Sequence, residues 1–158
     1  MTDRRPDPPR ADSVDSAELI SFGGPVDGVT VCLRFFGDEL DPDEVSRALG
    51  CQPTRAIRKG ESAPGRYHRV ATTGSWLLEG APADPPDVEE MIRGLLAAVS
   101  SDQWVWTDLT RRFSADIFCG LFLKRENRGF ELSAALSAEL AARNLVVGFD
   151  IYGPGRAE

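Results

Sequence analysis

The chain has 158 residues, of which 42% are hydrophobic and 27% are charged, and its formal net charge is −7. This length suits one domain, and this composition excludes a wholly disordered or fibrous protein. The negative charge opposes non-specific binding to nucleic acid and to anionic membranes, so neither is predicted as a partner.

The two ends of the chain contain little that a core could bury. Residues 1–26 are rich in Pro, Asp, Arg and Ser, and they predict a flexible tail. Residues 155–158 predict a flexible end, and residues 27–154 a single domain. The first residues lack the apolar segment of a signal peptide, and no apolar run approaches the roughly 18 residues of a membrane span, so we expect a cytoplasmic protein.

The cysteines and the single histidine predict no metal site and no cofactor. Cys32, Cys51 and Cys119 are an odd number, are widely spaced, and are accompanied only by His68. A zinc site or a disulfide framework needs a closer set of ligands or an even set of cysteines. We therefore expect the thiols to act mainly as small apolar side chains.

The first predicted elements are a strand, a helix and a second strand. Alternating β-branched and aromatic residues predict a strand over 29–36. Residues 41–44, Asp-Pro-Asp-Glu, are typical of a helix N-terminus with Asp41 as the N-cap, and Gly50 is a typical helix end. The next strand is expected around residues 54–58.

The middle of the chain predicts a loop, strands and two helices. Gly60 and Pro64-Gly65 mark the loop, followed by a weak strand candidate at 67–70 and a stronger one at 75–79. Apolar residues at helical spacing predict a long helix over 84–100. A short helix is expected over 104–112.

The last third predicts a strand, a helix and a closing strand. Residues 115–124 are apolar on both alternating faces, as in a strand at the centre of a sheet. Ser133 is the expected N-cap of a helix that ends near Asn144, and residues 145–152 predict the final strand.

This order predicts an α+β fold, namely a ferredoxin-like two-layer sandwich with a mixed sheet of about five strands and helices mainly on one face. Two strand-helix-strand units, 29–58 and 115–152, each imply a crossover helix over a common sheet. The other face is too aromatic to stay in water, so loops, the Trp104 segment or a second subunit should cover it. Its expected residues are Arg34, Trp76, Phe118, Phe122, Asp150 and Tyr152.

A basic segment interrupts this acidic chain. Residues 52–70 contain Arg55, Arg58, Lys59, Arg66 and Arg69, with Glu61 as the acidic residue among them. Guanidinium groups pair well with phosphate or carboxylate, so the segment with Trp76 is a candidate site for a small anion or a nucleotide. Alternatively, its cations balance acidic neighbours and Trp76 is a core residue. His68 is a further ligand-binding candidate in this loop.

Asp150 is an acid within an apolar strand, where burial would require a cation. Arg34 is the partner that we expect, and Tyr152 lies close by in the sequence. A structural ion pair and a perturbed catalytic carboxylate both fit this pattern. We name no catalytic residue.

Short motifs in a fixed order resemble the bacterial family catalogued as domain of unknown function 4279. The resemblance spans residues 29–153 and implies no catalytic residues that can be assigned to this chain. The proline-rich tail and Cys51 lie outside the family's pattern. The matching motifs are Leu49-Gly50, Pro53-Thr54, Lys59-Gly60-Glu61, Gly74-Ser75-Trp76, Phe130-Glu131-Leu132-Ser133 and Asp150-Ile151-Tyr152.

Three classes of function remain from the sequence. The first is a non-catalytic protein-interaction module, such as an inhibitor-like or immunity-like protein, which can also homodimerise; its negative surface would attract a basic partner. The second is a binder of small anions through the basic segment. The third is an enzyme whose site the sequence does not reveal. We expect a protein partner or self-association.

Overall fold

The computed structural model describes residues 23–63, 69–125 and 127–154. The predictions for residues 1–22, for the end 155–158, and for Arg66 and His68 fall outside these ranges. Residues 24–26, which the sequence assigned to the tail, belong to the fold, since Gly24–Pro25 form strand β1 and Val26 is buried.

The centre of the fold is a mixed sheet of five strands. They are β2 (Gly28–Gly37), β3 (Arg55–Ile57), β4 (Gly74–Glu79), β5 (Ser114–Phe122) and β7 (Val146–Tyr152), in the order β3-β4-β2-β5-β7. β2 runs antiparallel to both β4 and β5, β3 runs antiparallel to β4, and β7 runs parallel to β5. A separate short pair joins β1 to β6 (Arg128–Gly129).

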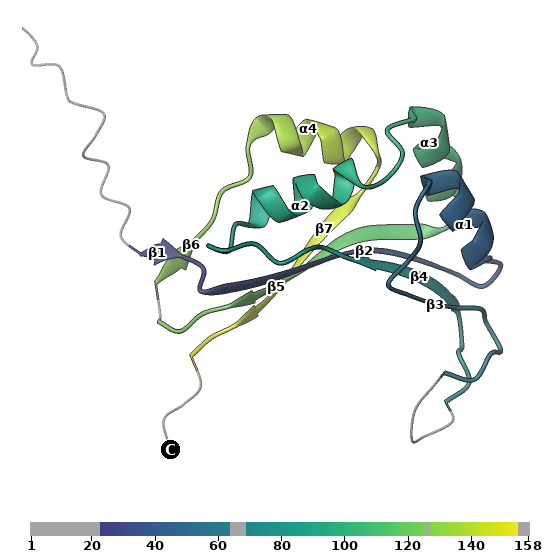
Figure 1. Ribbon diagram of the computed structural model, residues 1–158, viewed down its shortest axis with the longest axis horizontal. Helices are drawn as coiled ribbons and strands as arrows, with labels where there is room; N and C mark the ends of the chain where they lie inside the picture. The colour runs from purple at the N-terminus through teal and green to yellow at the C-terminus, as the bar shows by residue number, and fades with distance from the viewer. Residues whose placement is uncertain (1–22, 64–68, 126, 155–158) are drawn as a thin grey trace, which may run out of the picture.

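All four helices of the described residues lie on one side of this sheet (Figure 1). They are α1 (Pro42–Leu49), α2 (Val88–Ala97), α3 (Gln103–Arg112) and α4 (Ala134–Ala142). The side chains of Asp41 and Ser133 accept hydrogen bonds from backbone N–H groups in the first turn of α1 and α4, so both predicted N-caps are confirmed.

Helix α2 begins later than the sequence suggested. Its N-cap is Asp87, whose side chain accepts a hydrogen bond from the backbone N–H of Glu90. Pro85 and Pro86 precede this cap, and a residue before proline disfavours helical geometry, so Asp84 and Pro85 stay out of the helix.

The predicted two-layer α+β fold is confirmed, with helices on one face of a five-stranded mixed sheet. The strand order does not establish the more specific ferredoxin-like pattern. The two predicted strand-helix-strand units also differ from each other. β5 and β7 are direct neighbours, whereas β4 lies between β2 and β3.

The core lies between the helices and one face of the sheet, which we call the covered face. Phe35 of β2 is fully buried there, and its ring contacts both Trp76 of β4 and Trp106 of α3, with centroids 5.9 Å and 6.0 Å away. Such aromatic contacts add about 0.5–1.5 kcal/mol each to the free energy of area burial. The covered face therefore anchors three elements to one another.

Candidate functional site

The opposite side of the sheet, which we call the open face, carries the second set of alternating side chains. On β2, Val31, Leu33 and Phe35 are buried beneath the helices, so the side chains between them point to the open face. The strand register places the following residues on the open face: Thr30, Cys32, Arg34, Phe36, Arg55, Ile57, Ser75, Leu77, Glu79, Asp116, Phe118, Phe122, Val146, Asp150 and Tyr152.

An ion pair between neighbouring strands lies near the middle of the open face. Arg34 Nε and Nη2 donate to the two carboxylate oxygens of Asp116, each at 2.7 Å. The guanidinium also lies over the ring of Phe118, 4.3 Å from its centroid, and 5.5 Å from that of Phe36. The hydrogen bond to Asp116 raises the pKa of Arg34. The pair neutralises two charges on a face that remains partly apolar.

This pair corrects the expected partnership between Arg34 and Asp150. Asp150 lies on β7 beside Gly120, and its carboxylate is exposed and accepts a hydrogen bond from the Tyr152 hydroxyl at 2.5 Å. That hydrogen bond, with the negative charge of Asp150, raises the pKa of Tyr152. Asp150 is solvated and needs no buried cation.

An aromatic stack occupies the end of the open face near the edge strand. Phe122 of β5 and Tyr152 of β7 are directly paired in the sheet, and their rings are 4.9 Å apart and nearly parallel, at 9°. They are 44% and 46% exposed, respectively. Two large rings exposed at neighbouring positions form the kind of apolar surface that binds another molecule.

Trp76 does not lie on the open face, contrary to expectation. Its partner in the register is Phe35, so it belongs to the covered face, where it is fully buried. Its indole Nε1 donates to Ser46 Oγ at 3.0 Å, and Ser46 in turn donates to the carbonyl of Pro42. Trp76 is a core residue that joins β4 to α1, and it cannot stack on a ligand at the surface.

Three cations of the basic segment are paired with carboxylates. Arg55 donates to Glu79 at 2.7 Å, and Lys59 contacts Asp38. Arg58 Nη2 lies 2.6 Å from carboxylate oxygens of both Asp41 and Asp43. These acids lie around the start of α1 and at the end of β4. The anion site therefore stays a prediction in which a ligand must compete with these carboxylates.

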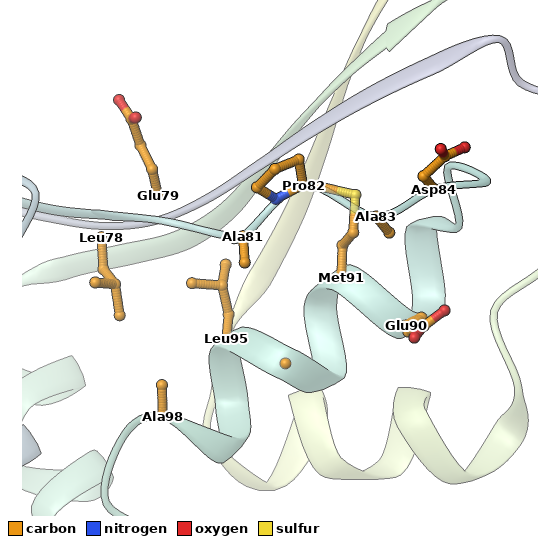
Figure 2. Close-up of a pocket in the computed structure, with 11 residues that line it drawn as sticks. Leu78, Glu79, Ala81, Pro82, Ala83, Asp84, Glu90, Met91, Leu95 and Ala98 are labelled. Atoms are coloured by element: carbon orange, nitrogen blue, oxygen red, sulfur yellow. The ribbon is translucent and has the colours of Figure 1, made fainter.

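A groove that the sequence did not reveal lies between helix α2 and the connection from β4 to α2 (Figure 2). It encloses about 480 Å³, and Met91 and Leu95 contribute apolar surface to it. Asp84 and Glu90 provide carboxylates around it, whereas the side chain of Glu79 points away from α2 (Figure 2). The path of the connection brings residues 79–84 against α2, so no local motif indicates this groove.

Burial disfavours ionisation of all three thiols. Desolvation raises the pKa of Cys32 and of Cys51, and it raises that of Cys119 to about 12. A thiol is a poor nucleophile because the thiolate is the reactive form. The thiols therefore act as apolar side chains at neutral pH.

Neither a metal-binding cluster nor a membrane span is found in the described part of the chain. Across residues 23–63, 69–125 and 127–154, no three His, Cys, Asp or Glu side chains gather in a way that suits a metal ion. None of the helices in those ranges has the length and apolarity needed to traverse a lipid bilayer.

The fold defines a small α+β sandwich domain in which one side of the sheet carries no helix from the described residues. The sequence model of the family described as Domain of unknown function (DUF4279) matches residues 27–154. The chain belongs to this family, which confirms the resemblance seen in the sequence. No curated protein and no solved structure matches the chain.

Proposed function

We propose that this chain is a non-catalytic protein-interaction domain that associates through the open face of its sheet. The observation that carries this proposal is the exposed apolar side chains at the β5–β7 side of that face, namely the stacked Phe122 and Tyr152 at one end of the strand pair and Val146 at the other. Apolar burial is the main favourable contribution to protein association, about 25 cal/mol per Å². A partner that covers these side chains removes them from water.

The polar groups of the open face also suit association. Arg34 and Asp116 satisfy each other through two hydrogen bonds, so a partner can cover them without leaving either charge unpaired. Interfaces commonly combine aromatic residues and arginine in this way. Because Asp116 is hydrogen-bonded to Arg34, its carboxylate is not free to act as a general acid or base, which supports a binding role over a catalytic one.

Photo-crosslinking in living cells tests this proposal even though the partner is unidentified. A photoreactive amino acid at Phe122 places the probe on the open face, and the same amino acid at the exposed Ala138 of α4 provides a matched control on the helical side. We expect a discrete protein adduct, either a second copy or another protein, at Phe122 and none at Ala138. Equal, diffuse labelling at both positions would contradict the proposal.

A basic protein is the second candidate partner, which would make the chain inhibitor-like or immunity-like. The groove along α2 supports it, because Asp84 and Glu90 stand beside the apolar side chains of Met91 and Leu95. An arginine or lysine side chain carries an apolar stem and a cationic end, which matches this combination. The net charge of −7 would speed the encounter with such a partner.

An arginine-rich peptide is the probe for this second candidate. We expect it to bind the chain, and Glu90→Gln to weaken that binding more than Glu39→Gln does, since Glu39 is exposed on the β2–α1 connection. Titration calorimetry at two salt concentrations measures both effects. Equal losses for the two variants would mean that only net charge attracts the peptide.

A further inference from the structure

We infer that the free edge of β7 pairs with the same edge of a second copy of this chain, antiparallel and around a twofold axis at Phe149. This inference goes beyond the proposed function, because it concerns the edge of the sheet rather than its open face and names a second copy of the chain as the partner. The result is a continuous sheet that runs through both protomers.

One hydrogen bond shows which residues of β7 direct their backbone groups to the free edge. β7 is the outermost strand of the sheet, with β5 as its neighbour. The backbone N–H of Leu123 donates to the carbonyl of Tyr152 at 2.8 Å, so Tyr152 directs its backbone groups toward β5. Successive residues of a strand direct these groups to opposite sides. Val147, Phe149 and Ile151 therefore present their N–H and C=O groups to the free edge.

An antiparallel pairing centred on Phe149 uses the whole strand. β7 has seven residues, and this register places Phe149 opposite Phe149 of the second copy, Val147 opposite Ile151, and Val146 opposite Tyr152. Each residue that faces the edge then meets another residue that faces the edge, as a hydrogen-bonded pair requires. A twofold axis between two residues would instead place each residue that faces the edge opposite one that faces away from it, along the entire strand.

The charge on β7 favours one of the remaining positions of the twofold axis. Asp150 is the only charged residue of the strand. A twofold axis at Asp150 would place two carboxylates directly opposite each other, which destabilises a strand pair. With the axis at Phe149, Asp150 lies opposite Gly148 of the second copy, and the space around Gly148 is open. An axis at Gly148 would leave Ile151 and Tyr152 beyond the end of the partner's strand.

Apart from Asp150, β7 also lacks the features that protect natural sheet edges. Short length, charges and prolines usually prevent such pairing. β3, at the other edge, has three residues, includes Arg55, and is followed by Arg58 and Lys59. β7 is longer, and Val146 and Ile151 are 67% and 59% exposed. Of the two edges, β7 is the one suited to association.

Exposed apolar side chains lie on both sides of β7 and can contribute to a dimer interface. Phe130 and Phe149 contact each other on the covered side of the strand, and Phe122 and Tyr152 stack on the open face. At about 200 Å² per buried aromatic side chain, their exposed fractions amount to roughly 330 Å² per protomer. With Val146 and Ile151, these exposed areas set an upper limit for two protomers near the roughly 1,000 Å² of a specific interface, since Phe122 lies on β5, one strand in from the paired edge.

A cysteine mixing experiment tests both the dimer and its register. Residues 146 and 152 of different chains face each other at a non-hydrogen-bonded position, where Cα atoms lie about 4.5 Å apart and a disulfide fits. Val146→Cys and Tyr152→Cys proteins are oxidised separately and as an equal mixture, with the unmodified protein as the control for native thiols. We expect a covalent dimer in the mixture and little in either protein alone.

Proline at position 151 provides an independent test. The N–H of Ile151 faces the free edge, so Ile151→Pro removes a hydrogen bond to the second copy and none to β5. Ile151→Thr is the matched control, because it keeps the N–H in a strand-compatible residue. By light scattering we expect the unmodified chain and Ile151→Thr to be dimers, and Ile151→Pro to be a monomer with the circular dichroism of the parent.

The outcomes separate this inference from the proposed function. A protein that is monomeric at every concentration at which it stays soluble overturns the β7 dimer. A dimer without the mixed disulfide overturns the edge and register, and it leaves pairing through the open face intact. An adduct from Phe122 to a different protein, together with a monomeric chain, supports the proposed function and overturns the self-pairing.

Discussion

Arg34 and Asp116, 82 residues apart in the sequence, are joined by two parallel hydrogen bonds of 2.7 Å across the centre of the open face. Their side chains are 27% and 26% exposed, so solvent screens this pair less than it screens the ion pairs at the rim. The ring of Phe118 beneath the guanidinium restricts it further. The geometry predicts that this is the ion pair with the largest energetic effect on the open face.

A double-mutant cycle on Arg34 and Asp116 measures that effect. We expect Arg34→Ala and Asp116→Ala to show a coupling free energy of about 1 kcal/mol or more in urea unfolding, since bidentate charged hydrogen bonds are strong. The exposed pair of Arg55 and Glu79, joined by one hydrogen bond, is the control, with about 0.5 kcal/mol or less expected. Equal coupling in the two cycles would contradict this ranking.

Ser46→Ala should destabilise the protein because it leaves the buried indole N–H of Trp76 without its acceptor. An unsatisfied buried donor costs about 1–3 kcal/mol. Ser137 of α4 forms the same kind of hydroxyl-to-carbonyl bond within its helix but is exposed, so Ser137→Ala should change stability by less than about 0.5 kcal/mol. Chemical denaturation of the two variants compares them, and similar losses would show that the indole bond adds nothing.

We expect Glu89 to account for part of the loss of folding stability at acid pH. Its carboxylate accepts hydrogen bonds from the backbone N–H and the hydroxyl of Ser133 and from Arg93, and the backbone bond is the largest cause of its lowered pKa. Because the pKa in the folded state lies below the usual value of 4.5, the stabilisation is complete above pH 4.5. It is lost as the pH falls through the lowered pKa.

The variant Glu89→Gln should therefore lose stability at neutral pH and show a weaker decline of stability below pH 4.5. Glu131→Gln, at another exposed glutamate near the start of α4, is the control and should keep the acid decline of the parent. Thermal melts across the acid range provide the measurement. An unchanged slope in Glu89→Gln would assign the acid sensitivity to other carboxylates.

Inorganic phosphate should not stabilise the protein more than sodium chloride of equal ionic strength. Arg55, Arg58 and Lys59 already have carboxylate partners, which an anion would have to displace. Thermal-shift titration gives the measurement, since a ligand at about 100 times its dissociation constant stabilises by about 2.7 kcal/mol. A phosphate-specific rise that Arg58→Ala removes would instead support the anion site.

Local patterns predicted the elements well because caps and alternation act over a few residues. Asp41, Ser133 and the alternation of β2 were each sufficient to place their element. The two-layer arrangement followed, since the strands needed helices over one face. The later start of α2 was missed because the spacing of apolar residues does not mark the first turn of a helix, whereas the cap Asp87 and the two prolines before it do.

The candidate site was harder to predict because it depends on the register between distant strands. Alternation shows that Trp76 and Ser75 point to opposite faces, but only the pairing of Trp76 with Phe35 shows which face is covered. In the same way, Asp116 and Asp150 both lie in apolar strands. Asp116 is the partner of Arg34 because β2 and β5 pair antiparallel and place these two residues opposite each other.

The placement of β2 beside β5 also bears on how the chain acquires its structure. Joining Arg34 to Asp116 closes a loop that contains most of the domain. Such distant contacts form slowly, because the chain loses conformational entropy on closing the loop before the contacts stabilise it. During synthesis, β2 leaves the ribosome long before β5 has been made. One backbone edge of β2 therefore stays unpaired until β5 is made, and an unpaired strand edge favours aggregation during this interval.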